Sequence, residues 1–378
     1  MQIYYLLIVT LLIIYMIINK IQYKLDFNKK MVFVLISCIL LIIISSFRSN
    51  SIGADMDVYL QIFESSKNKS MIDIISSGLS LDHFLSSEMY NGFYETGYIL
   101  FNKMVSIISD SDFAFKLSCS LFVNIPVCFM IYKYSKDELM SMLLFILLGY
   151  YTQSFVIIRQ YMALSMIIIA LHFLIESEDA KFYTFVFIAF LFHKTAIVFL
   201  IVKLLKSYWD IIIKYIKFIC IALSILFVLA NPILNFFIMN FYPFYSDKIV
   251  FGEGLNLLIF MLIILLFSLY IGKKNGYDLK KFDAFFVLVV VGVVIQLFTV
   301  HFSLLNRLAL YFQFFMIIYI PNSLSFIKKY KFLTNFIVLF VFLLYFSYLL
   351  IFNDSGQVKN YEMLFKYNIV LINESIKG

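Results

Sequence analysis

The chain has 378 residues, of which 63% are hydrophobic and only 14% are charged, and its mean hydropathy is +0.95. Helices of a soluble domain need a polar face, so this composition excludes a water-soluble protein. The formal net charge of +7 comes from short lysine-rich segments. No basic stripe interleaves with exposed aromatic residues, so we expect no nucleic-acid partner.

Apolar segments of about 17 or more residues recur along the whole chain, as they do in proteins with many transmembrane helices. The first segment, Ile3 to Asn19, has no cationic residue before it and no small-residue cleavage site after it. We interpret it as a retained span and not as a signal peptide. The sequence therefore predicts an all-α, polytopic integral membrane protein of about 10–12 transmembrane helices in a single membrane domain, residues 1–378.

Lysine-rich short loops mark the cytoplasmic side of a membrane protein. Four segments qualify, at 20–30, 203–217, 273–281 and 328–331. If all four lie inside, the N-terminus and the acidic loop 47–96 are extracytoplasmic. Residues 231–254, residues 301–307 and the tail after Phe352 then lie outside as well.

The region between Glu95 and Lys203 allows two arrangements. In one, five straight spans place Arg159 inside. In the other, Gly97–Ser109 lies on the outer surface, because at about 1.5 Å per residue it covers only about 20 Å of a hydrocarbon core of about 30 Å. Phe182–Lys206 is then a broken pair of short helices that turns at His193. We favour this second arrangement because it gathers the unusual polar residues on one face: Arg48, Asp55, Asp57, Glu95, Arg159, His193 and Arg307.

Arg159 lies within the otherwise apolar run Leu139 to Leu174. A cation in a membrane segment costs roughly 2.5–3.5 kcal/mol on insertion scales, so a functional or ion-paired role is expected. Arginine binds phosphate through two parallel hydrogen bonds, and a second arginine, Arg307, begins a later span. Two such cations at one face suit a diphosphate leaving group. We assign the substrate-binding role to Arg48, Arg159, Gln160, Lys194 and Arg307; a structural arginine paired with a carboxylate is the alternative.

Three carboxylates and one histidine are the candidates for proton transfer. Asp55 and Asp57 follow Gly53, which permits a tight turn directly after the second span, and Glu95 opens a later helix. His193 is the histidine best placed to exchange a proton. Interfacial anchoring, a helix-dipole contact or a core histidine would explain the same residues without catalysis. The four histidines form no metal-ligand cluster, and the four cysteines fit buried small hydrophobes, so we expect neither metal nor cofactor.

These segments resemble the EpsG-like, Wzy-type polysaccharide polymerases of bacterial O-antigen, capsule and exopolysaccharide synthesis. The resemblance spans roughly residues 30–320 and departs at Met56, where the family usually has an aromatic residue, and at the extra acid Asp57. It rests on five short motifs in order, namely Arg48…Gly53-x-Asp55…Tyr59, Glu95-x-Gly97-Tyr98, Ile158-Arg159-Gln160-x-x-Ala163, Phe192-His193-Lys194-Thr195-Ala196 and Asn306-Arg307.

The resemblance implies a glycosyltransferase that polymerises undecaprenyl-diphosphate-linked oligosaccharide repeat units at the outer face of the bacterial inner membrane. The growing chain would leave its lipid diphosphate for the non-reducing end of a new unit. The implied fold is that of a membrane glycosyltransferase that uses lipid-phosphate sugars. The implied partners are the lipid-linked substrates, the bilayer, a flippase and a chain-length regulator.

Two rival functions stay open at this stage. A flippase or transporter of the same lipid-linked oligosaccharide would also need cations at the membrane face, but it should show internal repeats of spans, which this chain lacks. A membrane O-acyltransferase that decorates the sugar would need a histidine–acid proton relay and a cytoplasmic thioester donor. It would gain support if His193 faced the cytoplasm.

Overall fold

The computed structural model describes residues 1–22, 28–78, 95–241, 255–274, 281–354 and 356–364. Within these ranges every regular element is a helix, and the only strand-like pairing is an isolated antiparallel bridge between Arg48 and Met363. The all-α prediction is therefore confirmed. Residues 79–94 of the predicted loop 47–96 lie outside the described residues, and the single-domain division stays a prediction.

Six of the described helices are long and apolar enough to cross a membrane, which confirms a polytopic membrane protein. Shorter apolar helices join them, and several predicted spans are broken into pieces. The six long helices are α1 (Gln2–Gln22), α2 (Lys29–Ser46), α8 (Asp112–Tyr134), α11 (Ile158–Ile175), α16 (Leu255–Lys274) and α20 (Lys331–Phe352). The shorter apolar ones are α7 (Thr96–Ile108), α9 (Glu138–Leu147), α17 (Ala284–Thr299) and the segment Ile216–Pro232 of α15 (Ile216–Phe241).

The lysine-bearing ends of the helices gather at one end of the bundle, which we call the lysine end. Lys30 Nζ at the start of α2 donates to the Ser135 carbonyl at the end of α8, at 2.6 Å. Lys133, also at the end of α8, pairs with Glu176 just beyond α11, at 2.9 Å. Because these helices run from one end to the other, Arg159 at the start of α11 lies at the opposite end, which we call the Glu95 end.

The segment after α11 runs to the Glu95 end and returns. Helix α12 (Asp179–Phe192) begins at the lysine end, where Asp179 pairs with Lys203 of α13 (Leu200–Ser207) at 2.5 Å. Between them the chain turns at His193 and forms a short 3₁₀ helix, η1 (Lys194–Phe199). The structure thus has the broken pair of the second arrangement, with its turn at His193.

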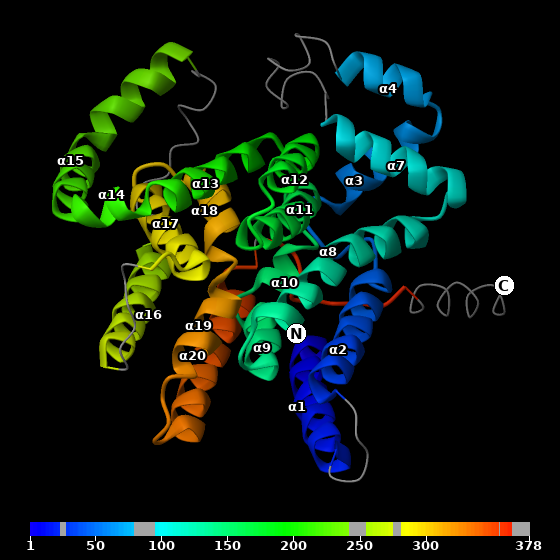
Figure 1. Ribbon diagram of the computed structural model, residues 1–378. Helices are drawn as coiled ribbons and strands as arrows, with labels where there is room; N and C mark the ends of the chain where they lie inside the picture. The colour runs from blue at the N-terminus through cyan, green and yellow to red at the C-terminus, as the bar shows by residue number, and fades with distance from the viewer. Residues whose placement is uncertain (23–27, 79–94, 242–254, 275–280, 355, 365–378) are drawn as a thin grey trace.

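The first part of the apolar run Leu139 to Leu174 is also broken. Helix α9 ends at Leu147, Gly149 takes the left-handed conformation with φ of 80°, and the one-turn helix α10 (Tyr150–Gln153) follows. Figure 1 shows α10 near the middle of the molecule, between α9 and α11. The Tyr151 hydroxyl donates to the Leu41 carbonyl of α2 at 2.8 Å, which holds the break inside the core.

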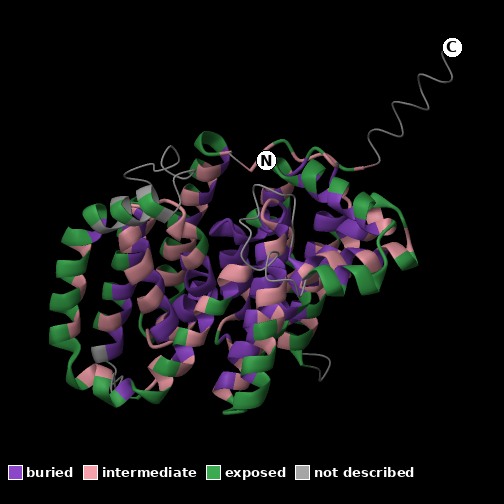
Figure 2. Cartoon of the chain, turned by 90° about the horizontal axis from the view of Figure 1, so that it is seen from above, coloured by how far each residue is buried: buried purple, intermediate pink, exposed green. Residues whose placement is uncertain are grey.

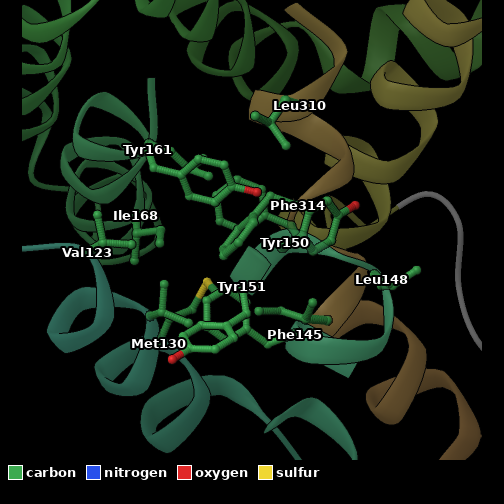
Figure 3. Close-up of a cluster of buried hydrophobic side chains, with 14 of the residues drawn as sticks. Val123, Met130, Phe145, Leu148, Tyr150, Tyr151, Tyr161, Ile168, Leu310 and Phe314 are labelled. Atoms are coloured by element: carbon green, nitrogen blue, oxygen red, sulfur yellow. The ribbon is translucent and has the colours of Figure 1, made fainter. Parts of the chain in front are cut away.

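Aromatic side chains fill the centre of the bundle around α10. The rings of Tyr150 and Phe314 have centroids 5.1 Å apart, and Tyr161 packs against Phe314 as well (Figure 3). Phe314 lies between α18 (Leu305–Gln313) and α19 (Met316–Leu324), the two halves of another broken crossing. Buried residues are concentrated in these central elements and exposed ones on the peripheral helices (Figure 2).

Three of the four cysteines, at positions 38, 119 and 128, are buried as expected, but Cys220 on α15 is exposed. It lies on a peripheral helix, whose outward face would meet lipid and not protein. Apolar surroundings in a membrane protein do not require burial within the protein, so the sequence alone could not separate these cases.

Helix α7 packs beside α3 (Met56–Lys67) and α4 (Met71–Gly78) and reaches α12 (Figure 1). The contact with α12 depends on Gly97. A Cβ atom there would lie 2.7 Å from the carbonyl oxygen of Leu191, closer than real Cβ atoms come. The absence of a side chain therefore lets the start of α7 lie directly against the end of α12.

Replacing Gly97 with alanine should separate the two helices, because the nearest atom belongs to backbone and cannot rotate away. We expect Gly97→Ala to lower the free energy of unfolding by about 1–3 kcal/mol, the usual penalty for overpacking. Thermal unfolding of the purified protein in detergent measures this. Met104→Ala on the exposed face of the same helix is the control, and equal unfolding midpoints for the two variants would contradict the proposed contact.

Candidate functional site at the Glu95 end

The buried carboxylate of Glu95 is the centre of a three-residue cluster. Glu95 precedes the first residue of α7, and its side chain is only 2% exposed. One carboxylate oxygen accepts a hydrogen bond from the Arg159 guanidinium. The other lies 2.8 Å from His193 Nδ1. Arg159 and His193 follow Glu95 by 64 and 98 positions in the sequence, yet both contact it directly. All three residues were predicted from the sequence as site residues.

Each member of the Glu95–Arg159–His193 cluster stands at a helix boundary. Arg159 is the second residue of α11, and His193 occupies the extended position between α12 and η1, with φ of −159° and ψ of 117°. The Ala196 amide donates to the His193 carbonyl at 2.9 Å and so fixes the turn. Helix ends leave their last side chains outside the regular packing, which lets three elements meet at one carboxylate.

The second imidazole nitrogen of His193 is not used by the fold. His193 is buried, yet its Nε2 has no hydrogen-bond partner among the described residues. The contact with Glu95 favours the tautomer in which Nδ1–H donates to the carboxylate, an assignment made from the hydrogen-bond pattern. Nε2 then carries a lone pair and can accept a proton, while Glu95 stabilises the imidazolium that results.

Tyr59 of α3 also belongs to this region, although it was not among the predicted site residues. It is 5% exposed. Burial raises the pKa of Tyr59 to about 12, even though the neighbouring cations of Arg159 and Arg307 act to lower it and Asp55 acts to raise it. The phenol therefore stays protonated and can donate a hydrogen bond at any physiological pH. Its position within the Gly53–Tyr59 motif is the only sequence signal that could have identified it.

The two aspartates of the acidic loop are not equivalent. Asp55 directly precedes α3, one helical turn before Tyr59, and its charge acts on that phenol. Asp57 lies two residues further along, so it points to a different side of the helix, and both carboxylates are exposed. Gly53 makes the turn as predicted: its φ is 105°, and a Cβ atom there would lie 2.6 Å from the Phe155 carbonyl oxygen. Asp55 is thus the aspartate whose charge acts on a residue of this region.

Arg307 is the second predicted arginine at the Glu95 end. It lies near the start of α18 and is exposed, and in the part of the chain that the structure describes it forms no salt bridge. The buried amide of Gln160 donates to the Arg307 carbonyl. Gln160 therefore positions the segment that carries Arg307, and the substrate contact predicted for it stays a prediction.

The other two predicted substrate contacts have separate surroundings. Arg48 is 2% exposed, its guanidinium donates to the Ser45 carbonyl and lies 4.8 Å from the centre of the Phe155 ring. Lys116 donates to the Arg48 carbonyl at 2.7 Å. These contacts hold the loop after α2 and include none of the cluster residues. Lys194 is half-buried at the start of η1, adjacent to His193.

The described residues contain no group of three or more histidine, cysteine or acidic side chains that could hold a metal ion. What the site does offer is a polarised imidazole, a buried carboxylate, a neutral phenol and two guanidinium groups. This set can accept a proton from a hydroxyl and bind an anionic group beside it.

Comparison with known proteins shows which family the chain belongs to. No curated protein and no solved structure matches the chain. A family model described as the EpsG family matches residues 31–363, which include the whole cluster and both arginines. The chain thus belongs to the EpsG family, as its motifs predict.

Proposed function

We propose that this protein is a glycosyltransferase that polymerises oligosaccharide repeat units carried on undecaprenyl diphosphate. The observation that carries the proposal is the contact of Glu95 with both Arg159 and His193, which joins a proton acceptor to a phosphate-binding cation. Membership of the EpsG family supports a polysaccharide polymerase-like role. The products would be O-antigen, capsule or exopolysaccharide.

In the proposed reaction His193 Nε2 takes the proton of the acceptor sugar hydroxyl. The hydroxyl oxygen then forms a bond to the anomeric carbon of the growing chain, and the bond from that carbon to the lipid diphosphate breaks. The diphosphate leaves with the bonding electrons. Glu95 keeps the imidazole in the required tautomer and stabilises its positive charge, so it acts through His193. Asp55 and Tyr59 would orient the sugar.

The two arginines would both bind the diphosphate leaving group. Arg307 is exposed and can meet both charged phosphates, and Arg159 lies beside the proton acceptor, held by Glu95. Guanidinium groups match phosphate geometry and stabilise the charge that develops on the leaving oxygen. Lys194, adjacent to His193, adds a further cation.

We infer that the Glu95 end faces the periplasm or the cell exterior of a bacterial inner membrane. The lysine end carries the positive charges that mark the cytoplasm, and the cluster lies opposite to it. A membrane O-acyltransferase would also use a Glu–His relay. Its thioester donor is cytoplasmic, however, and His193 lies away from the lysine end, so the polymerase is the better fit.

Proton transfer is tested by His193→Gln and Glu95→Gln. Removing a general base typically lowers a rate by about 10²–10⁴-fold, so both variants should accumulate single repeat units on lipid and make almost no polymer. Polymer ladders from cells measure this. His172→Gln and Glu176→Gln change the same residue types at the lysine end and should leave the ladders unchanged. Normal ladders from a well-inserted His193→Gln protein would exclude the proposed base.

The phosphate role is tested by comparing Arg307→Ala with Arg307→Lys. Arg307 is exposed, so both proteins should fold, and loss of its charge should abolish chains longer than one repeat unit. The lysine variant should recover part of the activity because it restores charge without two-point hydrogen bonding. Arg159→Ala should also abolish longer chains. If Arg307→Ala polymerises as well as the wild type, the leaving group is bound elsewhere.

Sidedness is tested by cysteine labelling in a cysteine-free background. Asp57 and Lys136 are both exposed, the first at the Glu95 end and the second next to Ser135 at the lysine end. A membrane-impermeant thiol reagent added to intact cells or spheroplasts should label Asp57→Cys. It should label Lys136→Cys only after permeabilisation. The reverse pattern would place the cluster in the cytoplasm and favour the acyltransferase.

A further inference from the structure

A large cavity lies next to Arg307, and apart from this arginine the proposed chemistry gives no role to the residues that line it. Its volume is about 830 Å³, and α10, α16, α18 and α20 contribute to its walls. Ligand sites in proteins commonly measure about 300–1,000 Å³. The cavity therefore has room for a substantial ligand.

The polar part of its wall consists mainly of amide side chains. Five of them line it, from four different segments: Gln153, Asn256, Asn306, Gln313 and Asn353. An amide both donates and accepts hydrogen bonds at every physiological pH, as a sugar hydroxyl does. The walls also include tyrosines 345 and 348, whose rings are flat and whose hydroxyls are polar.

The same wall disfavours a purely hydrocarbon occupant such as the isoprenoid chain. Three of the five amides have hydrogen-bond partners within the protein, but a lipid tail would offer none to Asn256 and Asn353, which costs free energy for each group. The one acid on the wall, Asp354, is already occupied, because its oxygens accept from the amides of Val358 and Lys359 at 2.8 and 3.1 Å. Apart from Arg307 and Asp354, the polar side chains of the wall are uncharged, and apolar side chains lie between them.

Part of the amide wall is held rigid by its own hydrogen bonds. Gln313 donates to buried Gln296 of α17, and Gln296 donates in turn to Asn306 at 3.1 Å. A wall fixed in this way loses little conformational freedom when a ligand binds. Such preorganisation is typical of a binding surface.

The cavity is joined to the cluster by two residues. Arg307 lines the cavity, and its charge also acts on Tyr59 beside Arg159. Ile157, another lining residue, stands two positions before Arg159. Arg307 is therefore shared between the cavity and the surroundings of the cluster.

We propose that this cavity is a carbohydrate subsite that binds an oligosaccharide through its amide side chains and tyrosines, separately from the lipid diphosphate. The proposal rests on the proposed function, because it assigns the sugar portion of a substrate to this wall. It predicts that the subsite recognises oligosaccharide that carries no lipid and no phosphate.

The test is a binding measurement on the full chain in lipid nanodiscs. The probe is the repeat-unit oligosaccharide released by mild acid from lipid-linked units of cells that lack this protein. We expect Asn256→Leu and Tyr348→Ala to raise the Kd of this probe about tenfold or more. Ile259→Leu and Leu344→Ala are matched controls, because they are exposed on the same two helices but do not line the cavity. They should change the Kd less than about twofold.

Thermal unfolding of each variant shows whether it is folded. Because the two lining variants lie on different helices, the other can still be tested if one of them misfolds. Equal Kd values for lining and control variants would overturn the subsite. Binding of undecaprenyl phosphate that the lining variants weaken, with no binding of the oligosaccharide, would assign the cavity to lipid and overturn it too.

The binding readout separates this inference from the proposed function. Glu95→Gln should bind the probe normally, because Glu95 does not line the cavity. A wild-type protein that binds the probe in the cavity but never forms polymer would refute the polymerase and leave the subsite standing. A polymerase whose lining variants bind normally would refute only the subsite.

Discussion

The neutralisation of a buried carboxylate is the constraint on which the Glu95 end depends. Glu95 cannot stay ionised at 2% side-chain exposure unless positive or hydrogen-bonding groups surround it. Arg159 and His193 supply them, and each belongs to a different helix boundary. Removing one partner of a buried ionic pair typically costs about 3–5 kcal/mol, so the starts of α7 and α11 and the break after α12 are tied to one another. The close approach at Gly97 makes this meeting sterically feasible.

Breaks in the membrane-crossing segments also help to place polar groups at the Glu95 end. A continuous helix would carry residues 182–206 past the cluster with every backbone group bonded internally. Interrupting it at His193 places an imidazole at a turn, where one ring nitrogen can bind Glu95 and the other can point away. The breaks after α9 and after α18 likewise open the wall around α10 that forms the cavity. Lipid tolerates such irregular backbone only where protein or water covers it, so broken helices and a polar site occur together.

The members of the site could be predicted from the sequence, but their pairings could not. Charged residues are costly in apolar segments, so Glu95, Arg159 and His193 stand out without any structure. Nothing local indicates that Gln160 would bond to the backbone of Arg307, since that contact depends on how α11 meets α18. The same holds for Arg48, whose contacts with a backbone carbonyl and the Phe155 ring are both set by tertiary packing. Spans were predicted well by composition, while their interruptions depend on close packing.

Glu95 also couples the two halves of the proposed chemistry, because both depend on one negative charge. When Arg159 lies against the carboxylate, part of that charge is neutralised and less of it acts on His193. If an arriving diphosphate attracts the guanidinium, the carboxylate loses part of its contact with Arg159 and keeps its hydrogen bond to His193 Nδ1. Occupancy of the phosphate site would then reach the proton acceptor through the carboxylate that both residues share. Two separate ion pairs could not do this. The sharing of one buried carboxylate by a cation and a histidine is thus a more specific feature of this chain than either residue alone.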